Sequence, residues 1–265
     1  MRRRNAAVVA LAVLAGLVVL QAQVSADYLL GSAQNYAVLG GSTVTNTGPT
    51  TVNGNLGLWP GTSITGFALT DGGPGLVTQG TIHIADSVAK QAQADALTAY
   101  NSLAGLASPP ANDLTGLDLG GRTLLPGVYN FDTSAGLTGM LTLDGNGELD
   151  PLFVFKIGTT LTTASLSSVL VKNGADAGDV YFQVGTSATL GTGTSFIGTL
   201  IASADDTLTT GVYVDGRVIA LTGAVTLDAN RINNPTSSVP EPGTLVLLLS
   251  GVAPLLAGKR QRLAA

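Results

Sequence analysis

The chain has 265 residues, with 12 Lys and Arg against 17 Asp and Glu, a formal net charge of −5 and no cysteine. An acidic chain repels nucleic acid, and a chain without cysteine can form neither disulfides nor thiolate metal sites. The composition therefore argues against a nucleic-acid-binding protein and against a disulfide scaffold. Stability must come from packing and hydrogen bonds.

The first residues have the features of an export signal. Arg2-Arg3-Arg4 precede an apolar run over residues 6–20, and Val24-Ser25-Ala26 supplies small residues at the cleavage positions. We expect residues 1–26 to be a secretory signal peptide and residues 27–238 to be the mature domain. That domain has six basic and sixteen acidic residues, a net charge of about −10, which strengthens the argument against nucleic acid.

The mature domain is rich in Gly, Thr, Val, Ile and Leu, a composition typical of β-strands joined by tight turns. One segment differs, because residues 84–106 contain no Gly before Gly105, and Ala92, Ala96 and Leu103 recur at helical spacing. Asp86 can cap the start of this segment. We predict one amphipathic helix over residues 84–106.

Three polar features are candidate sites of chemistry. Residues 144–150 resemble half of a calcium loop but lack its second half, so a polar turn is expected. Asp205-Asp206 is expected to solvate a corner of the fold, with a paired carboxylate for glycan chemistry as the alternative. His83, the sole histidine, is expected to form hydrogen bonds near the start of the helix. The sequence thus predicts no catalytic residue, no metal site and no cofactor, and the protein is not expected to be an enzyme.

An internal repeat indicates how the strands are arranged. Residues 188–202 can be laid over residues 206–220 without a gap, at an offset of 18, and a third copy begins at Thr226. Under this offset, Leu190 matches Leu208, and Gly198 matches Gly216. A period of this length with apolar residues in register is what stacked coils require, because each coil buries its inward residues only against its neighbours. We therefore predict a β-solenoid, with a two-sheet sandwich as the competing fold.

The C-terminal residues 239–265 contain Pro240-Glu241-Pro242, then an apolar run over residues 245–257, then Lys259-Arg260-Gln261-Arg262. The order resembles the PEP-CTERM sorting tail of exported proteins in Gram-negative bacteria. This resemblance implies transient anchoring in the membrane, processing by an exosortase-type enzyme, and a final location at the cell surface or outside the cell. A simple C-terminal anchor is the alternative.

Several ordered segments resemble the DUF3494 ice-binding protein family. They are residues 36–66, which begin Tyr36-Ala-Val-Leu-Gly, then Leu125-Pro-Gly-Val-Tyr129, Phe153-Val-Phe-Lys-Ile-Gly158, residues 184–194, and Gly223-Ala-Val-Thr-Leu-Asp228. The resemblance covers nearly the whole mature domain. It implies an irregular, discontinuous right-handed β-helix of roughly triangular section, one long α-helix packed alongside, no catalysis, and binding of ice through one flat β-face.

The repeat provides candidates for such a face. Thr189, Thr207 and Thr226 form one column, each just before an inward Leu, so they are expected to point outward. Thr160, which precedes Leu161, is a candidate further member of this column. Thr209, two residues after Thr207, is a candidate for a second rank, which is incomplete because Gly191 and Asp228 occupy the matching positions. The ligand would be ice or its ordered water, and the protein is expected to be a monomer.

Two alternatives to this hypothesis stay open. A Thr ladder can simply stabilise a sheet through contacts between strands. The protein could also be a non-enzymatic envelope or matrix protein that serves adhesion or binds exopolysaccharide, with weak or no ice activity.

Overall fold

The computed structural model describes residues 26–235. The predicted signal peptide, apart from Ala26, and the predicted sorting tail therefore lie outside the described residues. In the part of the chain that is described, no helix is long and apolar enough to cross a membrane.

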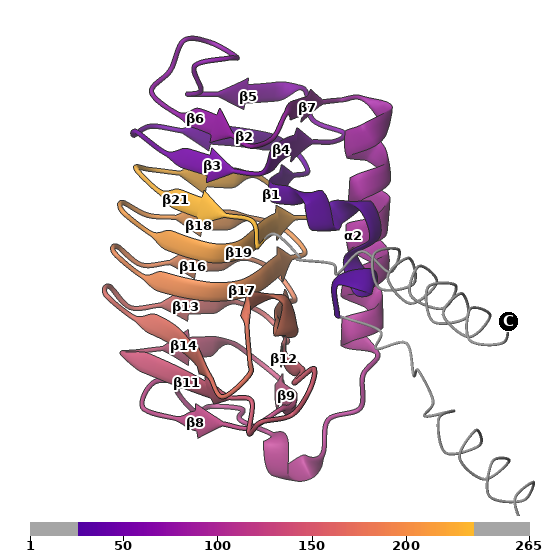
Figure 1. The fold of residues 1–265 in the computed structure, drawn as a ribbon, viewed down its shortest axis with the longest axis vertical. Helices are drawn as coiled ribbons and strands as arrows, with labels where there is room; N and C mark the ends of the chain where they lie inside the picture. The colour runs from indigo at the N-terminus through magenta and orange to yellow at the C-terminus, as the bar shows by residue number, and fades with distance from the viewer. Residues whose placement is uncertain (1–25, 236–265) are drawn as a thin grey trace, which may run out of the picture. The chain divides into compact units, whose positions relative to one another are not determined.

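The described chain is a stack of β-coils with a single long α-helix beside it (Figure 1). Every strand pair is parallel, and the strands form a 14-stranded and a 7-stranded sheet. The larger sheet folds around a corner, so each full coil contributes to three faces, which we call a, b and c. The prediction of a solenoid is confirmed.

Face b is the 7-stranded sheet and contains one short strand from each coil. In spatial order its strands are β10 (Ala135–Leu137), β13 (Leu161–Thr163), β16 (Ala188–Leu190), β18 (Asp206–Leu208), β20 (Val225–Leu227), β2 (Thr43–Asn46) and β5 (Ser63–Thr65).

Faces a and c are the two halves of the larger sheet. Face a contains β9 (Gly127–Phe131), β12 (Phe153–Ile157), β15 (Val180–Val184), the second halves of β17 (Ser195–Ala202) and β19 (Tyr213–Ala220), β1 (Tyr36–Gly40), β4 (Asn55–Leu58) and β7 (Ile82–Ile84). Face c contains β8 (Thr123–Leu124), β11 (Met140–Asp144), β14 (Ser168–Lys172), the first halves of β17 and β19, β21 (Arg231–Asn233), β3 (Thr51–Asn53) and β6 (Leu76–Thr78).

The corner between faces c and a depends on glycine. Gly198 and Gly216 lie in the middle of the eight-residue strands β17 and β19, with φ angles of 123° and 150°. Side chains disfavour these φ values. The space is also closed, since a Cβ on Gly216 would lie 1.9 Å from the carbonyl oxygen of Gly198 in the neighbouring coil. Glycine lets the strand bend while its ladder to the next coil continues.

The chain does not climb the stack in one direction. Its first coils, from β1 to β7, form one end, and α2 (Ser87–Ala104) then runs along the stack to the other end (Figure 1). Later coils climb back until β19 pairs with β1 and β21 pairs with β3. The N-terminal and C-terminal coils are therefore neighbours in the middle of the stack, and the fold is discontinuous, as the family resemblance implied.

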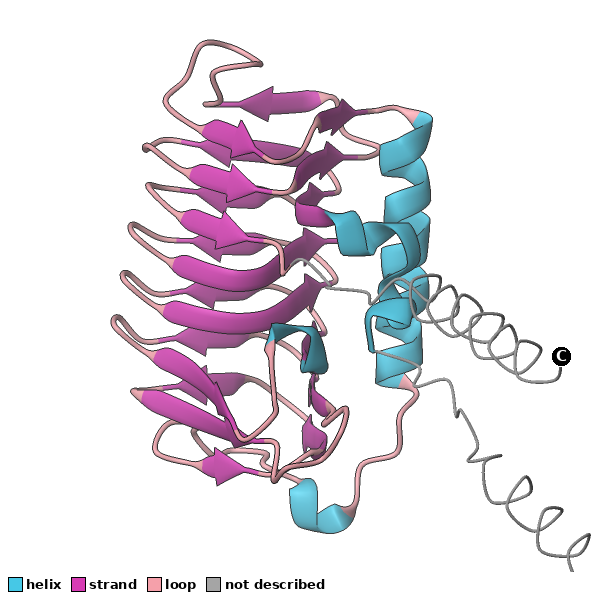
Figure 2. Cartoon of the chain, in the orientation of Figure 1, coloured by secondary structure: helices cyan, strands magenta, loops and turns pink. Residues whose placement is uncertain are grey.

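The predicted helix is confirmed, although it is shorter than residues 84–106 at both ends. Asp86 caps its first turn, because the carboxylate accepts a hydrogen bond from the Ala89 N–H at 2.8 Å, and Gly105 ends it. Its buried side, which includes Ala92, Ala96 and Leu103, packs with η1 (Ala26–Asn35) against face a. Figure 2 shows the helix standing beside the strands. Face a is therefore covered.

The interior of the solenoid is mostly apolar and contains a row of aromatic rings. Tyr129, Phe155 and Phe182 are in register on face a, with ring centroids 5.4 and 4.5 Å apart, and the Phe196 ring from face c packs 4.7 Å from Phe182. Inward residues thus form columns through the stack, as a solenoid requires. The short helices η2 (Pro110–Asn112) and η3 (Ala177–Asp179) lie in connections between coils.

The three polar features have different outcomes. Asp144 forms a polar turn, accepting hydrogen bonds from Asn146 and Asn173 and pairing with Lys172 at 3.0 Å, as expected. His83 bridges Asp86 and Thr81 at the helix start, also as expected. The expectation for Asp206 was wrong. Asp205 is exposed in a turn, but Asp206 is fully buried because it is an inward residue of β18.

The corner glycines provide a stability test. Gly216→Ala should lower the free energy of unfolding by about 2–6 kcal/mol, since backbone strain and overpacking each cost about 1–3 kcal/mol. Gly211→Ala is the matched control: φ is 73°, but no atom lies within 4 Å of the added Cβ, so about 1 kcal/mol is expected. Urea denaturation measures both. Equal losses would show that the close approach between coils at Gly216 is unimportant.

Candidate functional site

Face b bears an unbroken column of threonines along the solenoid. The strand register aligns one outward Thr from each of six adjacent strands, and at one end Gly136 takes the next position. In spatial order the threonines are Thr162, Thr189, Thr207, Thr226, Thr45 and Thr65. All six are exposed or partly exposed, whereas the neighbouring residues in the same strands are buried where they point inward.

The geometry of this column follows from the fold. Neighbouring parallel strands are about 4.8 Å apart, so the threonines repeat at that interval. A β-branched side chain has few χ1 rotamers, so its methyl and hydroxyl hold defined positions. None of the seven strands of face b contains Lys, Arg or His. The result is a narrow, uncharged strip of regularly spaced methyl and hydroxyl groups.

The sequence-predicted residues fall into two groups. The predicted alignment of Thr189, Thr207 and Thr226 is confirmed by the register. Thr160 does not belong to this column, because Thr162 is the residue opposite Thr189, and Thr160 lies two residues earlier, before β13 begins. Because side chains alternate with a period of two along a strand, Thr160 and Thr162 point to the same side of the sheet, but they belong to different columns.

Thr209 lies just after β18, at the edge of face b. Its hydroxyl donates a hydrogen bond of 2.8 Å to the carbonyl oxygen of Leu190 and lies 3.3 Å from the hydroxyl of Thr192. A hydroxyl that is engaged with the backbone is less free to order solvent. Thr209 therefore holds the edge of the sheet, and the role that the sequence suggested for it stays a prediction.

Three column members, Thr45, Thr65 and Thr162, were not identified from the sequence. Thr65 lies in Gly61-Thr-Ser-Ile-Thr-Gly66, whose resemblance to the repeat was visible, and its position after inward Ile64 was the available signal. Thr45 and Thr226 are opposite each other only because the N-terminal coils stack on the C-terminal coils. No local period encodes that contact.

Buried polar side chains hold the edge where face b turns toward face c. The hydroxyls of Thr163 and Thr194 lie 2.8 Å apart in the interior. Asn230 accepts a hydrogen bond from the N–H of Asp228 and donates one to the carbonyl oxygen of Thr209 in the next coil, both at 2.7 Å. Because these groups are shielded from water, their hydrogen bonds keep adjacent coils in register at this edge.

Two carboxylates flank the Thr column near its centre. Asp205 precedes β18 and accepts a hydrogen bond from the N–H of Ala224 at 2.7 Å, and Asp228 follows β20 and accepts one from the hydroxyl of Thr210. Both restrain turns between coils. Because carboxylates are strongly hydrated, they limit the width of the uncharged strip at its middle.

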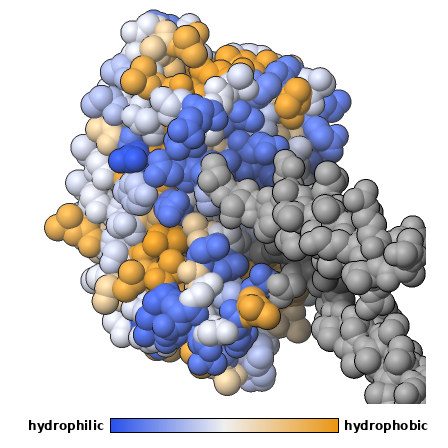
Figure 3. Space-filling view, in the orientation of Figure 1, coloured by the Kyte–Doolittle hydropathy of each residue, from blue (hydrophilic) through white to orange (hydrophobic). Residues whose placement is uncertain are grey.

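The other two faces lack such a strip. Face a lies under α2 and η1. Face c, which is turned toward the viewer in Figure 3, mixes hydrophilic and hydrophobic side chains. It contains an Arg231 guanidinium stacked 5.9 Å from the Tyr213 ring, and a half-buried Asp215, whose pKa is raised by burial and by Asp176. Among the described faces, only face b is exposed, uncharged along its centre and regular.

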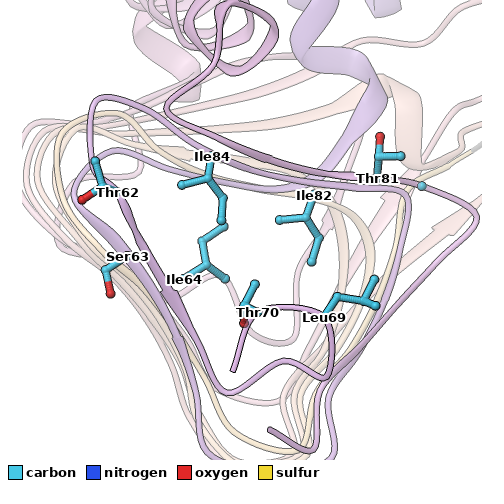
Figure 4. Close-up of a pocket in the computed structure, with 9 residues that line it drawn as sticks. Thr62, Ser63, Ile64, Leu69, Thr70, Thr81, Ile82 and Ile84 are labelled. Carbon is cyan, nitrogen blue, oxygen red and sulfur yellow. The ribbon is translucent and has the colours of Figure 1, made fainter. Parts of the chain in front are cut away.

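A hollow of about 620 Å³ lies at the end of the stack formed by β5, β6 and β7. Figure 4 shows Ile64, Ile82, Ile84 and Leu69 directed into the last coil. This coil is terminal, so its inward residues have a neighbouring coil on one side only. The hollow is therefore the unfilled interior of the terminal coil.

These features define a class of protein: a discontinuous β-solenoid with one flanking helix and one flat, Thr-bearing sheet. Residues 38–233 match the family model described as Ice-binding-like. The chain is 52% identical over 251 residues to an ice-binding protein of Nostoc sp. (strain HG1), covering 91% of this chain and 90% of that one. It is 35% identical over 246 residues to an ice-binding protein of Leucosporidium sp. (strain AY30), with 88% and 92% covered.

Solved structures agree. An ice-binding protein from an Antarctic biological consortium is 45% identical, with a TM-score of 0.72 and coverage of 77% of this chain and 89% of that one. The ice-binding protein of the Antarctic ascomycete Antarctomyces psychrotrophicus is 41% identical, with a TM-score of 0.72 and coverage of 78% and 98%. The chain belongs to the ice-binding-like family.

Proposed function

We propose that this protein binds ice by adsorption through face b. The observation that carries the proposal is the unbroken column of six threonines on a flat, exposed sheet. The family membership and the names of its relatives support it. They favour ice binding over the alternative, an envelope or matrix protein without ice activity.

The chemistry of Thr suits this task. Its methyl group disfavours strongly bound liquid water, while its hydroxyl can donate one hydrogen bond and accept two. Waters over the column can therefore be held at the interval of the strands, and water-mediated contacts are nearly as favourable as direct ones. A rigid column also loses little conformational entropy on binding, because its side chains are already fixed.

Adsorption of this kind involves no bond making. We therefore propose that the protein acts without catalysis and without a cofactor. One chain already supplies the whole column, which supports action as a monomer. Association with exopolysaccharide stays the alternative, and a wild-type protein that has no effect on ice would favour it.

The central prediction for this site concerns Thr207, in the middle of the column. Thr207→Lys should remove most of the thermal hysteresis, because a long hydrated cation interrupts the ordered water over several strands. Its effect on stability should be within about 0.5 kcal/mol, as for other outward surface changes. Thermal hysteresis and melting curves measure the two effects.

Thr98→Lys is the matched control, since Thr98 is exposed on α2 and its hydroxyl donates a hydrogen bond to the Ala94 carbonyl oxygen of the same helix. It should leave thermal hysteresis unchanged. If the wild type is active and Thr207→Lys retains full activity, the column is only a ladder that stabilises the sheet.

We also propose that the protein is exported and sorted through its two ends. The basic and apolar pattern of residues 1–26 and the Pro240-Glu241-Pro242 motif support this, with an exosortase-type enzyme as the processing partner. The location would be the cell surface or the medium.

In a host with the sorting enzyme, mass spectrometry of the exported protein should find Asp27 at the N-terminus and no residues beyond about Pro240–Gly243. An exported form that still carries Lys259–Arg262 would indicate a simple C-terminal anchor instead.

A further inference from the structure

Asp206 is the most unusual residue of the solenoid interior. Its side chain is 0% exposed, and neither carboxylate oxygen has a hydrogen-bond partner. It lies in β18 directly before Thr207, in register with Ala188 of β16 on one side and Val225 of β20 on the other. At the matching inward position the adjacent coils therefore carry apolar side chains.

Among the described residues, no positive side chain bonds to this carboxyl. β16 and β20, which pair with β18, carry no titratable side chain. On β19, which also packs near β18, Asp215 is only half-buried, Tyr213 bonds to Asn233, and Arg217 bonds to the Gln34 carbonyl oxygen of η1. The neighbouring Asp205 carboxylate acts on this carboxyl and is repulsive.

A buried carboxyl without partners is far less costly as the neutral acid than as the anion. Burial, with a smaller contribution from Asp205, raises the pKa of Asp206 well above its ordinary value of 3.8. The folded protein therefore keeps a proton on Asp206 under conditions in which the unfolded chain has lost it.

We propose that Asp206 is a pH sensor built into face b: when its carboxyl loses its proton, the anion moves toward water and draws β18, with Thr207, out of the flat sheet. Strand β18 is only three residues long and is held mainly by its ladders to β16 and β20. Displacing it interrupts the Thr column at its centre. In so far as it concerns ice, this inference rests on the proposed function.

The sign of the effect follows from linkage. Burial raises the pKa of Asp206 in the folded state above its value in the unfolded chain. The free energy of unfolding is therefore highest below pH 3.8, falls as the pH rises, and stops falling above the folded pKa. Relative to a variant with a neutral side chain at this position, the unfolding equilibrium constant of the wild type should grow about tenfold per pH unit across that range.

The test compares the wild type with Asp206→Asn, and with Asp205→Asn as the matched control for an exposed neighbouring carboxylate. Urea denaturation and thermal hysteresis are measured from pH 4 upward in steps of about one unit. Only Asp206→Asn should remove the loss of stability with rising pH, and its ice activity should stay constant where that of the wild type falls. If Asp206→Asn does not fold, Asp206→Ala replaces it, because Ala188 is the residue in the adjacent coil.

Parallel stability profiles for the wild type and Asp206→Asn would overturn the proposal. Divergent profiles with the same pH dependence of ice activity in both would overturn the link to face b. A wild type without ice activity at any pH would reject the proposed function, and in that case divergent stability profiles would still establish Asp206 as the sensor of the fold.

Discussion

The parallel hydrogen-bond ladder between successive coils is the constraint on which the rest of the structure depends. Each strand is in fixed register with the strands of the coils on either side, so a residue type repeated once per coil becomes a straight column. The same ladder gives the aromatic stack inside and the threonines outside. Corner glycines such as Gly216 are needed because the ladder continues through a bend.

The discontinuity of the chain extends this constraint beyond what one continuous repeat could give. Coils from the two ends of the described chain meet at the pairs β1–β19, β2–β20 and β3–β21. In the sequence repeat, Thr226 is the last threonine of the column. The contact between the two ends of the chain adds Thr45 and Thr65 beyond it. The column is longer as a result. Helix α2, along which the chain runs from one end of the stack to the other, covers face a and leaves face b exposed.

The sequence predicted the elements that depend on local period. The offset of 18 predicted the pairing of β17 with β19 residue by residue, because inward and outward positions alternate identically in both coils. The same offset did not place Thr160 correctly. Leu161 and Ala188 are in register but 27 residues apart, because the connection with η3 lengthens this coil beyond 18 residues. The expectation for Asp206 was wrong because charged residues are usually exposed, whereas the offset of 18 aligns Asp206 with Ala188, an inward residue.

Because the chain contains no cysteine, the surface that contacts ice can be identified directly by labelling. A single cysteine can be introduced on each surface in turn, at Thr226 on face b, Asn53 on face c and Thr98 on α2, and coupled to a bulky fluorescent label. The measurement is the fraction of each labelled protein taken up into a growing ice crystal. We expect only the label at Thr226 to reduce uptake, because Thr226 lies within the Thr column. Normal uptake of the Thr226-labelled protein, with uptake lost on labelling Asn53 or Thr98, would contradict this expectation.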